Sequence, residues 1–130
     1  MTIIPGEPVP KQRPRVTKRG ITYTPKKTTD YEKLIREFYD GEYFEKDIPL
    51  KMIIRCYFKI PDSWPKKKKE QALKNKIFVT KRPDVDNLAK IIQDSLNGKA
   101  FYDASQIVEL SIAKSYSDTP RVEIEILRRR

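Results

Sequence analysis

The residues best suited to chemistry are two aspartates, Asp84 and Asp86, which stand one residue apart directly after a proline. Pro83 disfavours helix before it, so the pair is expected in an extended entry, where side chains two apart share a face. Two adjacent carboxylates repel each other unless a cation lies between them. Carboxylate oxygens suit Mg²⁺ or Mn²⁺, which hold phosphate oxygens and activate water for in-line attack. A metal site for phosphoryl chemistry is one interpretation of this pair.

Lys90 lies four residues after Asp86, one turn further along an expected helix, and can point back toward the same carboxylates. There its ammonium would steady an attacked phosphate or a leaving oxygen. Lys81 and Arg82 come just before the pair and add positive charge to the same segment.

A helix cap is the competing interpretation, because aspartate and asparagine are favoured at helix starts and need no metal there. One cap accounts for only one of the two carboxylates, so both interpretations stay open on the residues alone. Asp103 is a further candidate acid, although an aspartate in an Asp-Ala-Ser turn commonly bonds only its own backbone. Asp94, one turn past Lys90, is expected to form an ion pair on that polar face.

The composition excludes several kinds of chemistry. The chain has 130 residues and no histidine, which removes the Ser-His-Asp triad, histidine-metal nucleases and zincin chemistry. Its single cysteine, Cys56, excludes an internal disulfide and a cysteine-rich zinc site, and fits a reducing, cytoplasmic setting. The first fifteen residues lack the apolar core of a signal peptide, and no segment is apolar enough to span a membrane.

A net charge of +10 favours polyanionic partners. Seven basic residues and no acidic one fall in residues 11–27, and four consecutive lysines start at Lys66. These lysines would occupy the positive end of a helix dipole, which is unfavourable and suggests contact with phosphate; a solvated lysine run is the plain alternative. The charge alone would also suit a small RNA-binding protein, but that leaves the paired carboxylates unexplained.

The elements that must position these residues follow from periodicity. We predict a short strand at 2–4, a hairpin of 15–17 and 21–23, a helix at 30–40 capped by Thr28 or Thr29, a central strand at 48–60 and a polar helix at 66–75. Residues 76–83 suit a strand or an extended lead-in to a helix at 87–97, and two strands follow at 107–115 and 121–127. The order predicts one domain over residues 1–130, an α+β fold with a small mixed sheet and helices on one face. Two apolar stripes are expected on the helices: Tyr31, Leu34, Ile35 and Phe38 on the first, and Leu88, Ile91, Ile92 and Leu96 on the last.

Together these motifs give the chain a strong resemblance to the RusA-type Holliday-junction resolvases. The resemblance covers nearly the whole length and is carried by Ile4-Pro5-Gly6, the Lys11–Arg15 and Tyr23–Thr28 segments, and most specifically by the runs Arg82–Lys90, Asp94–Gly98 and Asp103–Val108. It implies a homodimeric, Mg²⁺-dependent endodeoxyribonuclease that nicks four-way DNA junctions symmetrically, with Mn²⁺ as a possible substitute. A two-fold dimer would bring one acidic site to each of the two strands to be cut.

By position, the resemblance assigns catalytic roles to Asp84, Asp86 and Lys90. Family members usually have two adjacent aspartates where this chain has Asp103-Ala104, and the second of them serves as a catalytic acid. Asp103 is therefore taken as a substitute metal ligand and catalytic residue; the alternative is a protein that binds junctions but cuts them poorly. The residues expected to hold DNA phosphates are Lys11, Arg13, Arg15, Lys18, Arg19, Lys26, Lys27, Lys66, Lys67, Lys68, Lys69, Lys81 and Arg82.

Overall fold

The alternating segment near residue 55 forms the middle of a mixed sheet in the computed structural model, which describes residues 1–130. The α+β class and the mixed sheet are thereby confirmed. In chain order the elements are β1 (Thr2–Pro5), β2 (Arg15–Val16), β3 (Thr22–Tyr23), α1 (Lys26–Phe38), β4 (Leu50–Lys59), α2 (Lys66–Leu73), α3 (Val85–Leu96), a 3-10 turn η1 (Ala104–Gln106), β5 (Ile107–Ser117) and β6 (Arg121–Arg128).

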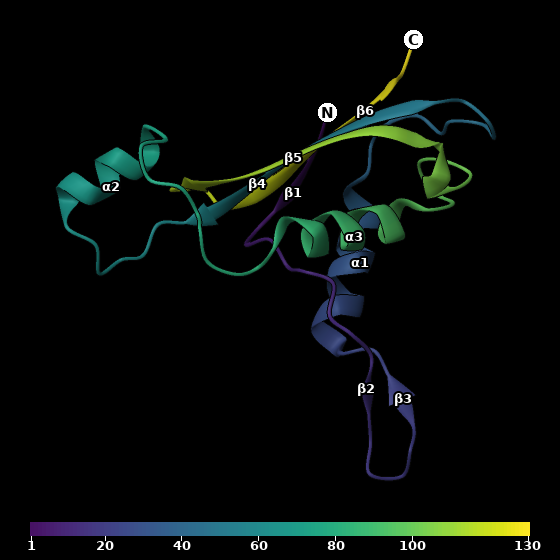
Figure 1. Ribbon diagram of the computed structural model, residues 1–130, viewed down its shortest axis with the longest axis horizontal. Helices are drawn as coiled ribbons and strands as arrows, with labels where there is room; N and C mark the ends of the chain where they lie inside the picture. The colour runs from purple at the N-terminus through teal and green to yellow at the C-terminus, as the bar shows by residue number, and fades with distance from the viewer.

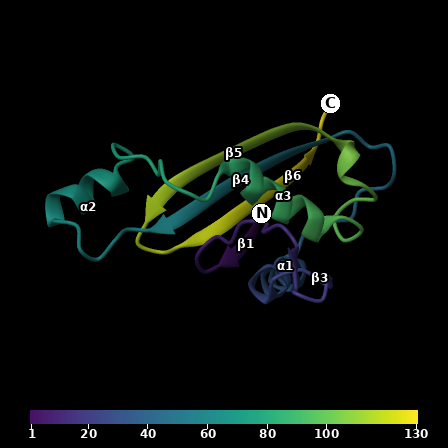
Figure 2. The same cartoon turned by 60° about the horizontal axis from the view of Figure 1, so that its bottom comes forward.

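The sheet has the order β1-β6-β4-β5, with β4 antiparallel to β6 and parallel to β5. Although β5 and β6 are joined by three residues, they do not pair with each other, because β4 lies between them (Figure 2). Every second residue of β4, from Leu50 to Phe58, is buried on one face. A strand paired on both sides and covered on one face needs this alternation.

Helices α1 and α3 cover the apolar face of the sheet and contact each other, whereas α2 lies beyond its end (Figure 1). The predicted stripe of α3 is fully buried, at 1% exposure or less. On α1 the prediction holds for Tyr31 and Ile35, and Leu34 packs at the core margin. For Phe38 it is wrong: this last residue of the helix is 43% exposed, because the chain leaves the core there.

The predicted cap of α1 is also wrong. The helix begins at Lys26 with Pro25 at the N-cap position, and no side chain caps it. Thr28 is instead buried within the first turn, where its hydroxyl donates to Gln12 Oε1 over 3.3 Å. Pro25 can start the helix because its ring fixes φ near the helical value and it has no N–H to satisfy.

The remaining predictions concern connections. The hairpin β2–β3 is confirmed and extends away from the sheet and from α1 (Figure 1). Residues 76–83 form no strand and lead into α3 with bends at 76–77 and 81–83, so the strand alternative is wrong. No helix combines the length and hydrophobicity needed to cross a bilayer.

Candidate functional site

Asp84 occupies the N-cap position of α3, with extended backbone at φ −75° and ψ 150°. Its side chain accepts no capping hydrogen bond and is exposed to solvent. An N-cap aspartate ordinarily accepts a hydrogen bond from a backbone N–H of the first turn. The cap interpretation therefore does not account for this carboxylate, which is free to bind a ligand.

Asp86 is also exposed but lies in the first turn of α3, so the extended entry predicted for both aspartates is correct for Asp84 and wrong for Asp86. Its Oδ1 accepts a hydrogen bond from the backbone N–H of Asn87 over 3.0 Å, which leaves the other oxygen unbonded. The positive end of the helix dipole favours negative charge at this place. The start of α3 thus presents two carboxylates to solvent with most of their lone pairs available.

Lys90 lies one turn along from Asp86, and its ammonium is 3.6 Å from Asp94 Oδ2, which confirms the ion pair expected for Asp94. The Lys90 side chain is 62% exposed, so this pair leaves it free to reorient. The Lys11 ammonium forms two ion pairs, with Asp94 Oδ2 over 3.4 Å and with Glu32 Oε2 over 3.2 Å. Burial opposes the charge of Lys11, but hydrogen bonding and attraction from both carboxylates outweigh it and raise its pKa.

A cavity of about 560 Å³ opens beside Asp84, formed where the N-terminal segment meets the start of α3. The backbone N–H of Lys11 donates to the carbonyl of Asn87 over 3.0 Å and holds the two segments together. The cavity is lined by Pro10, Lys11, Arg13, Arg82, Pro83, Asp84 and Asn87. Because Lys11 is already paired with two acids, Arg13 and Arg82 are the cations best placed to meet a phosphate there.

The expected third acid lies elsewhere. Asp103 precedes η1, beyond the C-terminal end of α3, and caps that turn: its Oδ2 accepts from the backbone N–H of Ser105 over 3.0 Å. This hydrogen bonding lowers the pKa of the Asp103 carboxyl. No group of three acidic, cysteine or histidine side chains is placed to hold one metal ion. Within one chain, Asp103 is thus not brought together with Asp84 and Asp86, and its metal role stays a prediction.

The donor set still fits a hard divalent cation. Magnesium in proteins is often held by one or two carboxylates, with waters and substrate phosphates completing the coordination. Asp84, which lines the arginine-containing cavity, and Asp86, which keeps one oxygen unbonded, match that description. The residues that would hold the ion are Asp84 and Asp86.

The other basic residues predicted to bind DNA fall in two further places. The hairpin and the start of α1 carry exposed charges, namely Arg15, Lys18, Arg19, Lys26 and Lys27. The α2 lysines, from Lys66 to Lys69, lie at the far end of the sheet, and Lys68 stacks on the Trp64 ring at 4.0 Å from its centroid. Lys81 is exposed near the end of the loop that leads into α3.

Sequence reasoning missed Lys114, on β5. Its ammonium donates to the carbonyls of Lys81 and Pro83, over 2.9 Å each, directly before Asp84. A signal was available, since strand alternation places this lysine between Ile112 and Tyr116 on the side that otherwise faces the core.

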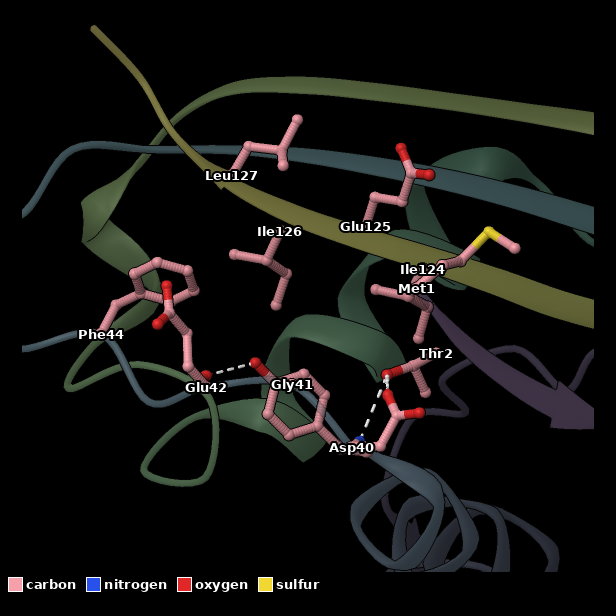
Figure 3. Close-up of a pocket in the computed structure, with 11 residues that line it drawn as sticks. Met1, Thr2, Asp40, Gly41, Glu42, Phe44, Ile124, Glu125, Ile126 and Leu127 are labelled. Atoms are coloured by element: carbon pink, nitrogen blue, oxygen red, sulfur yellow. Dashed lines mark hydrogen bonds between the residues drawn. The ribbon is translucent and has the colours of Figure 1, made fainter.

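A smaller hollow, of about 190 Å³, lies between the end of α1 and strands β1 and β6 (Figure 3). Two of its polar side chains are paired within it: the Thr2 hydroxyl donates to Asp40 over 2.7 Å, and the Tyr39 hydroxyl donates to the carbonyl of Glu42. Nothing in it resembles a reactive centre.

Several known proteins are similar to this chain in sequence. The family described as Endodeoxyribonuclease RusA matches residues 5–127. An uncharacterized Bacillus subtilis (strain 168) protein, YqaN, is 38% identical over 128 residues, covering 93% of this chain and 90% of its own. A crossover junction endodeoxyribonuclease, rusA, of Lactococcus phage r1t is 40% identical over 86 residues, covering 65% of this chain and 59% of its own. With a match over nearly its full length, the chain belongs to the RusA endodeoxyribonuclease family.

Proposed function

We propose that this chain is a Mg²⁺-dependent endonuclease that resolves four-way DNA junctions by two symmetric nicks. The observation that carries the proposal is the free carboxylate of Asp84, next to Asp86 and to a cavity lined by Arg13 and Arg82. Family membership and the named activity of the phage relative support the substrate class.

Each residue has a separate task in this proposal. Asp84 and Asp86 hold the ion, which when bound supplies charge stabilisation to a phosphodiester under in-line attack. Arg13 and Arg82 orient the phosphate through charge-assisted hydrogen bonds. Lys90, one turn away and mostly exposed, swings from Asp94 to stabilise the leaving oxygen.

Binding the junction requires more surface than the cavity provides. The hairpin carries Arg15, Lys18 and Arg19 on one side of the molecule, and α2 carries its lysines beyond the end of the sheet. Contacts to phosphates at such separated places would position DNA arms without reading sequence. A homodimer would present two equivalent copies of this surface, as two symmetric nicks require.

The test is cleavage of a synthetic four-way junction with Mg²⁺ or Mn²⁺, beside a linear duplex of the same sequence. We expect paired nicks at symmetric positions in the junction and none in the duplex. Absence of cleavage with either ion, in both the native chain and Ala104→Asp, would refute the nuclease proposal.

A second candidate function, junction binding without cutting, is favoured by Ala104 and by the absence of a third acid beside Asp84. It predicts tight, salt-sensitive binding with no product, and little loss of binding in Asp84→Asn. Each phosphate contact releases counterions, so affinity should fall steeply as salt rises from about 50 to 200 mM. Binding insensitive to salt would argue against both functions.

A further inference from the structure

The side of the sheet that faces the helices carries one charged residue at a position where its neighbours are apolar. Register pairs Lys114 of the edge strand β5 with Cys56 of β4, between the pairs Ile54–Ile112 and Phe58–Tyr116. Cys56 is fully buried and Lys114 is partly so. Burying an ammonium among apolar side chains is costly unless it has hydrogen-bond partners.

Two main-chain carbonyls supply those hydrogen bonds. Nζ of Lys114 lies 2.9 Å from the carbonyl oxygen of Lys81 and 2.9 Å from that of Pro83. Lys114 forms no ion pair with a carboxylate. Its charge is therefore directed entirely at the loop that leads into α3.

That loop has little other support. Residues 77–83 belong to no helix or strand and make no backbone–backbone hydrogen bond. The two bonds from Lys114 are the ones that join this stretch to the rest of the chain, apart from the packing of Val79 and Ile77. Because a peptide unit is planar, fixing the Pro83 carbonyl also fixes the nitrogen and the Cα of Asp84, the atom that carries its side chain.

We propose that Lys114 is a positioning residue: it holds segment 81–84 in the conformation that presents Asp84 to the metal ion. This inference rests on the proposed function, since it concerns the same site. The competing explanation is that an inward-pointing charge on an edge strand prevents pairing with another sheet. In that case Lys114 would affect aggregation but not the affinity for metal.

The experiment compares Lys114→Met, which keeps the length of the side chain and removes both hydrogen bonds, with Lys114→Arg, which keeps the charge. Lys51→Met serves as the matched control, because Lys51 lies in the neighbouring strand on the opposite face and pairs with Glu109 over 2.9 Å. Affinity for Mn²⁺ alone is measured by electron paramagnetic resonance, without DNA. We expect Lys114→Met to bind Mn²⁺ about 10- to 100-fold more weakly, the range for residues that hold a metal ligand in place. Lys114→Arg should recover part of the loss, and Lys51→Met should match the native chain.

Limited trypsin digestion followed by mass spectrometry gives a second readout that needs no metal. Cleavage of the Lys81–Arg82 bond should be about tenfold faster in Lys114→Met, the factor equivalent to one hydrogen bond to a charged group. Cleavage at Lys18 in the hairpin should not change and serves as the internal reference.

The outcomes separate the two proposals. Native Mn²⁺ affinity and native cleavage at Lys81 in Lys114→Met would overturn the role of Lys114. Failure of the native chain to bind Mn²⁺ would instead overturn the metal site, and with it the link from Lys114 to metal, whereas the trypsin result would still decide whether Lys114 holds the loop.

Discussion

The strongest quantitative test of the site is the substitution Asp84→Asn. In the structure the Asp84 side chain is exposed and accepts no capping hydrogen bond, so folding does not depend on its charge. Asparagine is as good an N-cap residue as aspartate, and its neutral side chain removes a repulsion with Asp86. Without divalent ions, the free energy of unfolding should therefore stay within about 0.5 kcal/mol of the native value.

The native chain and Asp84→Asn should differ in stability once Mg²⁺ is added. With free Mg²⁺ at about ten times its dissociation constant, binding to the folded state adds RT ln 11, about 1.4 kcal/mol. An entropy of unfolding of about 2.1 cal/mol/K per residue gives about 270 cal/mol/K for this chain of 130 residues. Dividing this binding free energy by this entropy of unfolding predicts a rise in Tm of about 5 °C for the native chain. In Asp84→Asn the remaining carboxylate of Asp86 should yield less than about 1 °C at the same concentration.

The assay is thermal unfolding by circular dichroism in MgCl₂ against NaCl of equal ionic strength, which cancels general screening. Asp62→Asn is the matched control, because Asp62 is an exposed aspartate just past the end of β4 and is paired with Lys59 over 3.5 Å. Asp62→Asn should show the same Mg²⁺-dependent rise in Tm as the native chain. An equal rise in Asp84→Asn and the native chain would refute the assignment of Asp84 as a ligand, and no rise in the native chain above NaCl would refute the metal site.

Three further outcomes are expected. Lys90→Met should lower the cleavage rate about 100- to 1,000-fold, the usual cost of removing one group that stabilises developing charge, with junction binding measured by gel shift unchanged. Burial raises the pKa of the Cys56 thiol to about 12, so the free energy of unfolding should fall as pH rises from about 9, where the unfolded thiol ionises, and urea titrations should show a smaller fall in Cys56→Ala. Ala104→Asp should leave the Tm nearly unchanged and increase junction cleavage; unchanged cleavage would show that the missing acid is not what limits activity.

Periodicity predicted much of this fold. The alternation in β4 and the stripe of α3 are dictated by which faces are buried, and both patterns are visible in the residues alone. The failures lie at ends and connections. Thr28 is as good a capping residue as any, but Pro25 starts α1 earlier and Thr28 becomes buried. The placement of β4 between β5 and β6 is also hidden, because a three-residue connection equally suits a hairpin.

The candidate site shows the same division. Asp84, Asp86 and Lys90 are close in sequence, so the chain alone places all three at the start of α3, and helical spacing puts Asp86 and Lys90 on one face. Their supports come from distant parts of the chain. Lys11 reaches α3 from the N-terminal segment, and Lys114 reaches the loop from an edge strand, through contacts that depend on tertiary packing. A lysine on the core side of a strand signals that it has a polar partner, but the sequence does not say which, and Lys114 was missed.

The position of Ala104 bears on how a complete site would form. Asp84 and Ala104 lie beyond opposite ends of α3, and twelve helical residues span about 18 Å. An acid introduced at 104 therefore cannot reach an ion held by Asp84 of the same chain, so any gain in cleavage from Ala104→Asp has to arise between two copies. Antiparallel α3 helices across a two-fold axis would bring the end of one beside the start of the other, twice. Mixing native chains with chains carrying both Asp84→Asn and Ala104→Asp distinguishes the cases. If the acid acts across the interface, mixed dimers should cut faster than native dimers, at the one site that combines Asp84 of the native chain with the acid introduced in its partner. If the acid acts within its own chain, mixed dimers should show no gain in cleavage.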